Sequence, residues 1–275
     1  MDSLDGYVSD DELAIEPLRD LGCDVQTVSW RDTTVDWNSF NIVVIRTTWD
    51  YQRAPDAFLA VLQEIESSKA RLENSLDVVK WNLDKRYLRE LASKGINVVP
   101  TIWDGVYTHK SFDVWLDELN CRELIIKPTV SATAEHTYRM REFDPNLTDI
   151  FRTRAFMVQP FIEMIVSEGE YSVFYMGGEY SHTILKSPKT ADFRVQEEHG
   201  GIISAVESTA KLRENARAIF DMLHPSPLYA RVDLVRDAGD DFALMELEII
   251  EPALYLRMDP GAPRRFAAAI DGWMN

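Results

Sequence analysis

Apolar residues recur along the N-terminal part of the chain with periods typical of both helices and strands. Residues 10–21 and 55–67 carry apolar side chains every three or four positions, which predicts two amphipathic helices. The short run at 25–28 and the unbroken β-branched run at 42–45 predict strands, the second of them buried on both faces. Strand and helix in alternation indicate an α/β layer with parallel strands.

The start of the chain leaves two interpretations of this layer. A parallel layer of this kind normally opens with a strand before its first helix, but nothing before Asp10 is apolar enough for a buried strand. Either the first strand has been lost from the sequence, or the layer is a smaller sheet. The pattern favours neither interpretation.

The middle of the chain mixes helices with short strands. Helical patterns occupy residues 82–94 and 112–119. Apolar runs at residues 98–100, 124–128 and 157–162 predict strands. No internal repeat or low-complexity linker separates these elements.

The C-terminal part is richer in hairpins. Gly177 and Gly178 lie between two strand-like runs, which is typical of a β-hairpin turn, and a long helical pattern covers residues 207–223. The four strands predicted here are residues 171–176, 180–185, 229–235 and 242–248. The change from alternating elements to hairpins marks at least two regions in a chain of the α/β (α+β) class.

Composition narrows the classes of function. The 275 residues include 46 acids against 29 Lys and Arg, for a formal net charge of −17. Such a surface argues against nucleic acid as a partner, because phosphates need a basic face. No apolar run approaches the roughly 20 residues of a membrane span, so no membrane partner is expected. Cys23 and Cys121 are too few for a disulfide framework, which predicts a cytoplasmic location.

Three acids on the last two predicted strands form the sharpest candidate site. Glu246 and Glu248 are two positions apart, so they point to the same face of their strand, where Asp233 is able to join them across the hairpin. Carboxylates gathered on an apolar framework repel one another unless a cation binds, and oxygen ligands suit Mg²⁺ or Mn²⁺. The alternative is a hairpin whose acids simply face water.

Three lysines lie where an anion would be held. Lys127 ends one apolar strand, Lys186 ends another, and Lys85 falls in the predicted first turn of the 82–94 helix. A cation at a helix N-terminus opposes the helix dipole unless an anion is bound there. Each lysine alone is more typical of a solvated surface. Together with the carboxylates they predict a polyphosphate held between a metal ion and lysines.

The order of these motifs resembles that of the ATP-grasp ligases. Within that family the chain is most similar to the branch of bacterial glutathione synthetase and D-cycloserine synthetase. The similarity covers nearly the whole chain, and no single motif carries it. The matching segments are Asn82 to Lys85, Ile126-Lys127-Pro128, residues 158–162 and 169–174, Asp233, Glu246-Leu247-Glu248 and Pro252, together with residues 44–51.

The resemblance implies an ATP-grasp architecture, in which an N-terminal parallel α/β layer precedes two α+β subdomains that clasp the nucleotide. The expected divisions are residues 1–80 without the usual first strand, residues 81–157 as a lid subdomain, and residues 158–275 as a C-terminal subdomain with the metal site. The implied partners are ATP, Mg²⁺ or Mn²⁺, and small-molecule carboxylate and amine substrates, and a homo-oligomer is left open.

The resemblance also implies roles for individual residues. The positions that bind ATP are matched by Lys85 and Lys127 at the phosphates, Ser131 in the loop above them, Gln159, Phe161 and Ile162 at adenine, and Glu168 or Glu170 at ribose. The metal ligands are matched by Asp233, Glu246 and Glu248. Catalytic positions near the transferred phosphate are matched by Lys186 and Arg231, and the acceptor region by Arg46, Arg194 and His199.

The sequence departs from the family pattern at two places. Glu248 stands where the family usually has Asn, which adds a negative charge but keeps an oxygen ligand. The loop at residues 129–136 contains no glycine, although the family's phosphate loop is glycine-rich, because only glycine permits the closest backbone approach.

The function implied is an ATP-dependent carboxylate–amine ligase that forms an amide or peptide bond through an acylphosphate. One alternative is a cyclo-ligase that acts within a single molecule. The other is a nucleotide-binding protein without ligase activity, which the glycine-free loop favours.

Overall fold

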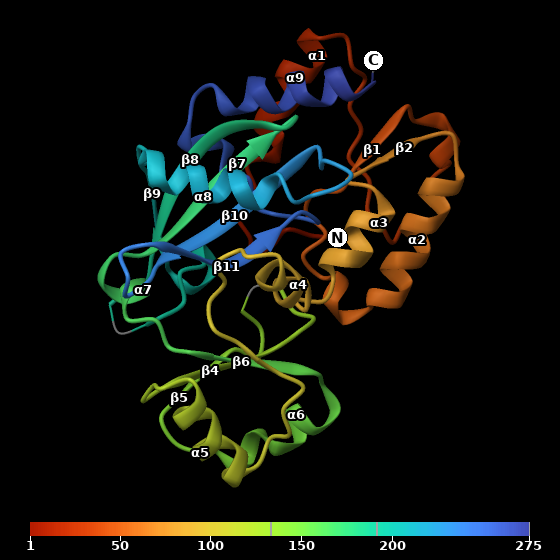
Figure 1. The fold of residues 1–275 in the computed structure, drawn as a ribbon. Coiled ribbons are helices and arrows are strands. Elements are labelled where there is room, and N and C mark those ends of the chain that lie inside the picture. Colours follow the sequence, from red (N-terminus) through yellow and green to blue (C-terminus); the bar gives the residue numbers. More distant parts are fainter. Residues whose placement is uncertain (133, 191, 275) are drawn as a thin grey trace.

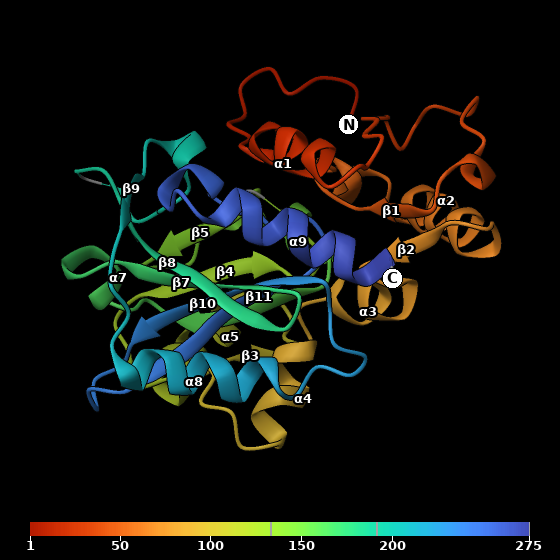
Figure 2. The same cartoon turned by 90° about the horizontal axis from the view of Figure 1, so that it is seen from above.

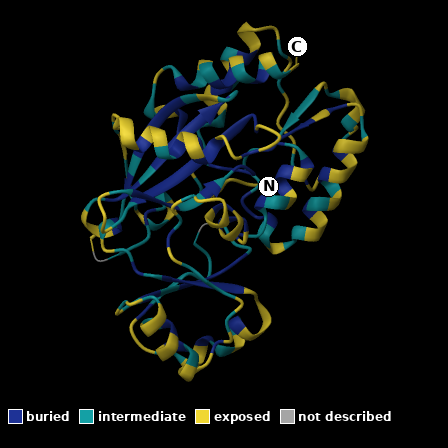
Figure 3. Ribbon diagram, viewed as in Figure 1, coloured by how far each residue is buried: buried dark blue, intermediate teal, exposed yellow. Residues whose placement is uncertain are grey.

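Three β-sheets organise the chain in a computed structural model that describes residues 1–132, 134–190 and 192–274 (Figure 1). The smallest sheet belongs to the N-terminal part, a four-stranded sheet to the middle, and a five-stranded sheet to the C-terminal part. Figure 3 shows that the strands of the five-stranded sheet are largely buried, whereas the outward faces of the helices are exposed. Helices and sheets are mixed, as the sequence predicts.

The N-terminal sheet consists, in the described residues, of two parallel strands, β1 (Ile42–Val44) and β2 (Arg71–Glu73). They are joined by α2 (Pro55–Ser67), which begins at a proline and buries Phe58, Leu62 and Ile65 along one side. The predicted helix is confirmed, and so is the parallel pairing of strands in this layer.

The strand predicted at 25–28 is wrong, because this segment pairs with no other strand in the described part of the chain. Val25 instead packs, partly buried, in the apolar cluster of α1 (Ile15–Asp20) and α9 (Ala262–Met274). The helix predicted at 10–21 is present as a 3₁₀ turn, η1 (Asp11–Ala14), followed by α1. Its Ala14 and Leu18 are buried.

The helix predicted at 82–94 is two helices, α3 (Leu76–Asn82) and α4 (Tyr87–Ser93). Lys85 therefore lies in the turn between them and not in a helical first turn. The turn is fixed from outside the helices, because the Lys85 amide donates to the Thr129 carbonyl at 2.8 Å. The strand predicted at 98–100 is reduced to a single bridge between Val98 and Leu244.

The four-stranded sheet is antiparallel and has the order β3-β6-β4-β5. Its strands are β3 (Ile102–Trp103), β4 (Leu124–Pro128), β5 (Tyr138–Met140) and β6 (Phe156–Pro160). Helices α5 (His109–Glu118) and α6 (Thr148–Thr153) pack against it, and Phe112, Trp115, Phe151 and Phe156 lie in their shared core. Figure 1 shows this unit below the rest of the chain.

The five-stranded sheet is also antiparallel and has the order β11-β10-β7-β8-β9. Its strands are β7 (Glu170–Met176), β8 (Glu179–Ser187), β9 (Ile202–Ala205), β10 (Tyr229–Arg236) and β11 (Phe242–Glu248). Both predicted hairpins are confirmed. The turn between β7 and β8 has positive φ at Gly177 and Gly178, which glycine adopts without steric cost.

Helices cover the two faces of this sheet (Figure 2). Along β7, Val173 and Tyr175 join the core of α8 (Ala210–Phe220), while Phe174 and Met176 join the core of α9. This is the period of two that a strand buried on both faces requires. Short turns complete the chain: η2 (Trp37–Ser39), η3 (Tyr51–Arg53), η4 (Pro145–Leu147), α7 (Met164–Ser167), η5 (Glu197–His199) and η6 (Leu256–Met258). None of the helices in the described residues has the length and apolar character needed to cross a membrane.

Candidate active site

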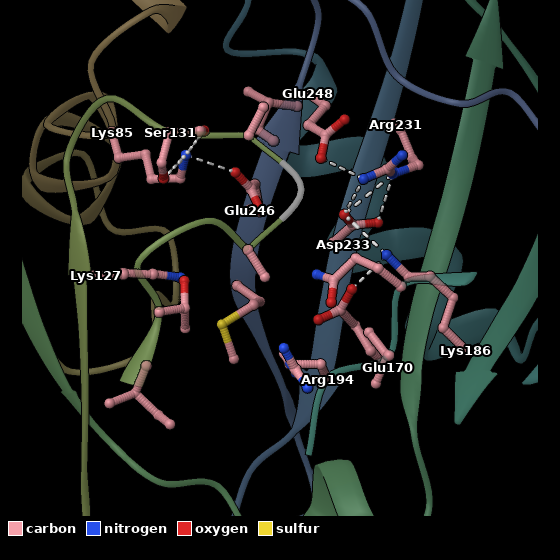
Figure 4. A pocket seen from close by; sticks show the side chains of 18 of the residues that line it. Lys85, Lys127, Ser131, Glu170, Lys186, Arg194, Arg231, Asp233, Glu246 and Glu248 are labelled. Carbon is pink, nitrogen blue, oxygen red and sulfur yellow. Dashed lines mark hydrogen bonds and ion pairs between the residues drawn. The ribbon is translucent and has the colours of Figure 1, made fainter. Parts of the chain in front are cut away.

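A single pocket gathers most of the predicted site residues between the four-stranded and five-stranded sheets (Figure 4). Strands β4 and β6 supply one wall, and β7, β8, β10 and β11 supply the other. The predicted residues that line it are Lys85, Lys127, Ser131, Gln159, Phe161, Ile162, Glu170, Lys186, Arg194, Arg231, Asp233, Glu246 and Glu248. Residues spread over more than half of the sequence thus meet at one place.

Strand alternation explains why the charged residues of β10 reach this pocket. Tyr229 lies on the face that α9 covers, and its ring meets that of Phe266 edge-on with centroids 6.0 Å apart. Arg231 and Asp233 lie on the same face two and four positions further along, where they line the pocket. The intervening Ala230 and Val232 are buried in the core on the opposite face.

The three predicted carboxylates converge. Asp233 on β10 pairs in register with Glu246 on β11, and Arg231 pairs with Glu248. One oxygen from each of Asp233, Glu246 and Glu248 lies within 4.8 Å of the other two. Carboxylate oxygens at this spacing suit a divalent cation such as Mg²⁺.

Protein cations partly neutralise this group. The Asp233 carboxylate lies 2.9 Å from Arg231 Nη2 and 3.2 Å from Lys186 Nζ, and it accepts a hydrogen bond of 2.5 Å from Ser172 Oγ. Burial opposes its ionisation, but Arg231 and Lys186 outweigh burial and hold the pKa of Asp233 at about 2. Glu248 contacts Arg231 as well, yet burial raises its pKa to about 7. Glu248 is therefore less readily ionised than Asp233.

Two lysines face the carboxylates across the pocket. Lys85 Nζ lies 3.1 Å from Glu246 Oε1 and donates to the Ser131 carbonyl at 2.7 Å. Lys127 is buried, and its ammonium forms no hydrogen bond or ion pair with any described residue. Burial lowers the pKa of Lys127. A buried ammonium without a partner is costly, which fits a site for an anion.

The candidate adenine residues lie on β6 and just after it. Gln159 Nε2 donates to Thr101 Oγ1 at 3.0 Å, and the Phe161 amide donates to the Glu123 carbonyl at 2.9 Å. The Arg139 guanidinium lies 3.5 Å from the centroid of the Phe161 ring. These contacts fix the strand at the inner edge of the pocket.

The two candidate ribose acids lie in different places. Glu170 lines the pocket and pairs with Lys186 at 2.5 Å. Glu168 lies outside the pocket lining, where it pairs with Arg236 at 2.9 Å and accepts from the Tyr171 hydroxyl at 2.7 Å.

The three predicted acceptor residues also separate. Arg194 lines the pocket, but its guanidinium is bound to Asp192 at 2.9 Å. Arg46 is partly buried outside the lining, where it pairs with Asp11 at 2.9 Å and donates to the Pro252 carbonyl at 2.7 Å. His199 lies on η5, whose neighbouring Glu198 lines the pocket.

Sequence reasoning assigned no role to several residues of the pocket wall, among them Trp49, Tyr51, Glu251 and Tyr255. Residues 44–51 entered only through their resemblance to a family segment, in which Arg46 alone was given a role. Glu251 follows two isoleucines and precedes Pro252, so a buried acid in an apolar run was the available signal.

The glycine-free loop adopts backbone conformations that usually need glycine. Ala134 has φ of 55° and His136 has φ of 57°, both in the left-handed region. The Glu135 and Thr137 amides close turns onto the Ala132 and Ala134 carbonyls at 3.1 and 3.2 Å. Thr133 lies outside the described residues. Ala and His thus hold a geometry that glycine holds at lower cost.

The residues present fit a nucleotide with its metal ion. The carboxylate group offers oxygen ligands at suitable spacing, and Lys127 offers a buried cation that forms no hydrogen bond or ion pair with the described residues. Asp233, Glu246 and Glu248 would hold Mg²⁺, while Lys85 and Lys127 would hold phosphate oxygens.

Comparisons with known proteins agree with this geometry. A family described as "D-cycloserine synthetase DcsG, N-terminal domain" matches residues 1–74. The cycloserine biosynthesis protein DcsG of Streptomyces lavendulae is 31% identical over 278 residues, covering 93% of this chain and 91% of that protein.

Solved structures extend the likeness to the fold. The crystal structure of D-cycloserine synthetase DcsG matches with a TM-score of 0.83 and 26% identity, covering 96% of this chain and 94% of that one. The ATP-grasp ligase PsnB, solved with a phosphomimetic variant of its minimal precursor, Mg and ADP, matches with a TM-score of 0.66 and 14% identity over 96% and 94%. The predicted ATP-grasp architecture is confirmed, and the chain is an enzyme that belongs to the ATP-grasp ligases.

Proposed function

We propose that this enzyme joins the carboxyl group of one small molecule to an amine by way of an acylphosphate. A carboxylate oxygen of the substrate attacks the γ-phosphorus of ATP, and ADP leaves. The amine nitrogen then attacks the carbonyl carbon, inorganic phosphate leaves, and the nitrogen loses a proton as the amide forms. The cofactors proposed are ATP and Mg²⁺, as in the PsnB structure solved with Mg and ADP.

Cations on both walls of the pocket would stabilise the charge of this reaction. Lys85 and Lys127 would hold ATP phosphates from the wall formed by β4 and the α3–α4 turn. Lys186 and Arg231 lie beside Asp233 on the opposite wall, where they would stabilise the oxygens that gain charge in both steps. Magnesium on the three carboxylates would neutralise phosphate charge.

The remaining assignments keep the roles implied by the family. Glu170 is preferred to Glu168 as the ribose acid, because only Glu170 lines the pocket. Residues 81–157 would act as a lid, because β4 and β6 form one wall of the pocket and would exclude water from the acylphosphate. Both cysteines are free thiols, which is consistent with a reducing compartment such as the cytoplasm.

Lys127 is the observation that carries this proposal. Its unpartnered ammonium lies in the same pocket as a carboxylate group suited to a divalent cation, and a metal-bound polyphosphate satisfies both. ADP release measured against amino acids and dipeptides tests it. Lys127→Ala should abolish ADP release, whereas Lys110→Ala, on the exposed side of α5, should leave it unchanged. Near-normal ADP release in Lys127→Ala would refute the proposal.

A cyclo-ligase is the second candidate, and the 31% identity to a cycloserine biosynthesis protein favours it. In that case one molecule carries both the carboxyl group and the amine. Mass spectrometry separates the two reactions, because ring closure yields a product of one substrate mass less one water. Tight ATP binding without ADP release from any compound would instead favour a nucleotide-binding protein without ligase activity.

A further inference from the structure

Glu251 is a buried carboxylate of the pocket wall that the proposed chemistry leaves unused. It is 6% exposed and lies three residues beyond Glu248. Its backbone carbonyl accepts a hydrogen bond of 2.8 Å from Trp49 Nε1, so the neighbouring segments fix its position. The Tyr51 hydroxyl lies beside its side chain, and Trp49 and Tyr51 line the same pocket.

Among the described residues, the Glu251 carboxylate forms no ion pair. Every other carboxylate named in the pocket wall between β7 and β11, namely Glu170, Asp233, Glu246 and Glu248, forms an ion pair with Lys or Arg. No Lys or Arg of the described residues pairs with Glu251. Glu251 also stands outside the group of three whose oxygens lie within 4.8 Å of one another, so it is not a further member of the metal site.

A buried carboxylate in this setting is suited to a cationic ligand. Burial and the charge of Glu248 raise the pKa of Glu251, so the ionised form is costly while the pocket holds no further cation. A primary ammonium offers three N–H donors and one positive charge, which a carboxylate and a neighbouring hydroxyl are able to receive.

We propose that Glu251 and Tyr51 form the subsite that binds the protonated amine of the substrate. The inference rests on the proposed ligase function and names its substrate class, a small molecule with a primary amine. Lys85 and, to a smaller extent, Arg231 are the cations that contribute to the electrostatic field at Glu251, and Arg231 also reaches the Ala253 carbonyl at 3.4 Å. A substrate with its ammonium at Glu251 and its carboxylate toward Arg231 therefore finds opposite charges at its two ends.

A panel of matched compounds tests this subsite. ADP release is measured with 2-amino acids of both hands and with the corresponding 2-hydroxy acids, such as alanine and lactate. Only the amine-bearing acids should support turnover. Glu251→Gln should raise the KM of the best amino acid at least about tenfold and leave the KM of ATP unchanged, with Glu179→Gln on the exposed end of β8 as the matched control. An amino-acid KM within twofold of wild type, or equal turnover with hydroxy acids, overturns the subsite.

Two further measurements keep the subsite testable without turnover. Without ligands, Glu251→Gln should unfold at the same or a higher temperature, because it replaces a buried carboxyl group that forms no ion pair with Lys or Arg of the described residues. A clear fall in unfolding temperature marks a structural carboxylate and overturns the inference.

If no compound releases ADP, the ligase proposal fails, and the subsite is tested by calorimetry. The same amino acids are titrated into protein loaded with a non-hydrolysable ATP analogue and Mg²⁺. Binding that Glu251→Gln abolishes supports the subsite, and the absence of any binding by these amines overturns it.

Discussion

The Asn82 carboxamide donates a hydrogen bond of 2.8 Å to the carbonyl of Leu247, the residue between the carboxylates Glu246 and Glu248. The Tyr87 hydroxyl makes two hydrogen bonds with the backbone of Leu247. It donates to the Leu247 carbonyl at 2.9 Å and accepts from the Leu247 amide at 2.9 Å. Asn82 and Tyr87 flank the turn that carries Lys85. The turn is thereby fastened to the edge strand β11, which carries two of the proposed metal ligands, Glu246 and Glu248, and this sets the approach of Lys85 to Glu246.

Tyr87→Phe should therefore weaken both the fold and the nucleotide site. The variant leaves the buried Leu247 amide without its partner, which costs about 1–3 kcal/mol of unfolding free energy. It should also raise the KM of ATP, because the Lys85 turn loses a fixed attachment to β11. Urea unfolding and steady-state kinetics measure the two effects. Tyr175→Phe is the control, because the Tyr175 hydroxyl forms no hydrogen bond with the described residues. Equal losses of unfolding free energy in the two variants would contradict the argument.

The hairpins and the carboxylate group were predictable from sequence because their signals are local. Two glycines mark the β7–β8 turn, and the two-residue spacing of Glu246 and Glu248 requires a shared face whatever the rest of the fold does. Asp233 required one further step, the register of a hairpin whose turn is short. Such features depend on neighbours within a few residues of one another.

Other features depend on contacts between distant segments, and sequence patterns miss them. The helical period runs through residues 82–94, but the Thr129 carbonyl and Leu247 hold the intervening turn open. The short run at 25–28 has a strand-like composition but no strand edge beside it. Glu251 was hidden among isoleucines, since its importance depends on where Tyr51 lies, 200 residues earlier in the chain.

The three carboxylates should differ in what they contribute to stability. Asp233 is 1% exposed and receives Arg231, Lys186 and Ser172, so Asp233→Asn leaves buried cations undercompensated and should cost about 3–5 kcal/mol. Glu246→Gln loses only the ion pair with Lys85 and should cost less. Both variants should lose Mg²⁺-dependent ADP release. Denaturant unfolding without ligands measures the difference, and a larger loss in Glu246→Gln would contradict this ranking.

The phosphate loop offers a test of backbone strain. Alanine in the left-handed conformation costs about 1–2 kcal/mol, and Ala134→Gly relieves that cost. The gain in stability roughly offsets the loss caused by the greater conformational freedom of glycine in the unfolded chain. Ala132 is not in the left-handed region, so Ala132→Gly brings only the entropic loss. We expect Ala134→Gly to be more stable than Ala132→Gly by about 1 kcal/mol. Thermal unfolding of the two variants measures this, and the reverse order would show that the loop carries no strain at Ala134.

A buried histidine should make stability depend on pH. His182 is stacked on Phe174 with ring centroids 4.3 Å apart, and its Nε2 lies 3.1 Å from the Leu254 carbonyl, just before the pocket residue Tyr255. Burial lowers its pKa to about 4, from the ordinary value of 6.5. Between pH 6.5 and pH 4 the unfolded chain binds more protons than the folded chain does. The contribution of His182 to the free energy of unfolding is therefore complete above pH 6.5 and is lost as the pH falls toward 4.

The expected loss attributable to His182 is about 2 kcal/mol of unfolding free energy between pH 7 and pH 5. The glutamine of His182→Gln does not titrate, so the unfolding free energy of this variant should fall less between pH 7 and pH 5 than that of wild type. The other titrating groups contribute equally to both proteins. Urea unfolding at pH 7, 6 and 5 measures the two slopes, with His109→Gln on the exposed start of α5 as the control. Burial is the main cause of the lowered pKa, while Asp259 opposes the shift and Arg265 adds to it. Identical slopes for wild type and His182→Gln would mean that the imidazole is hydrated in the fold and titrates normally.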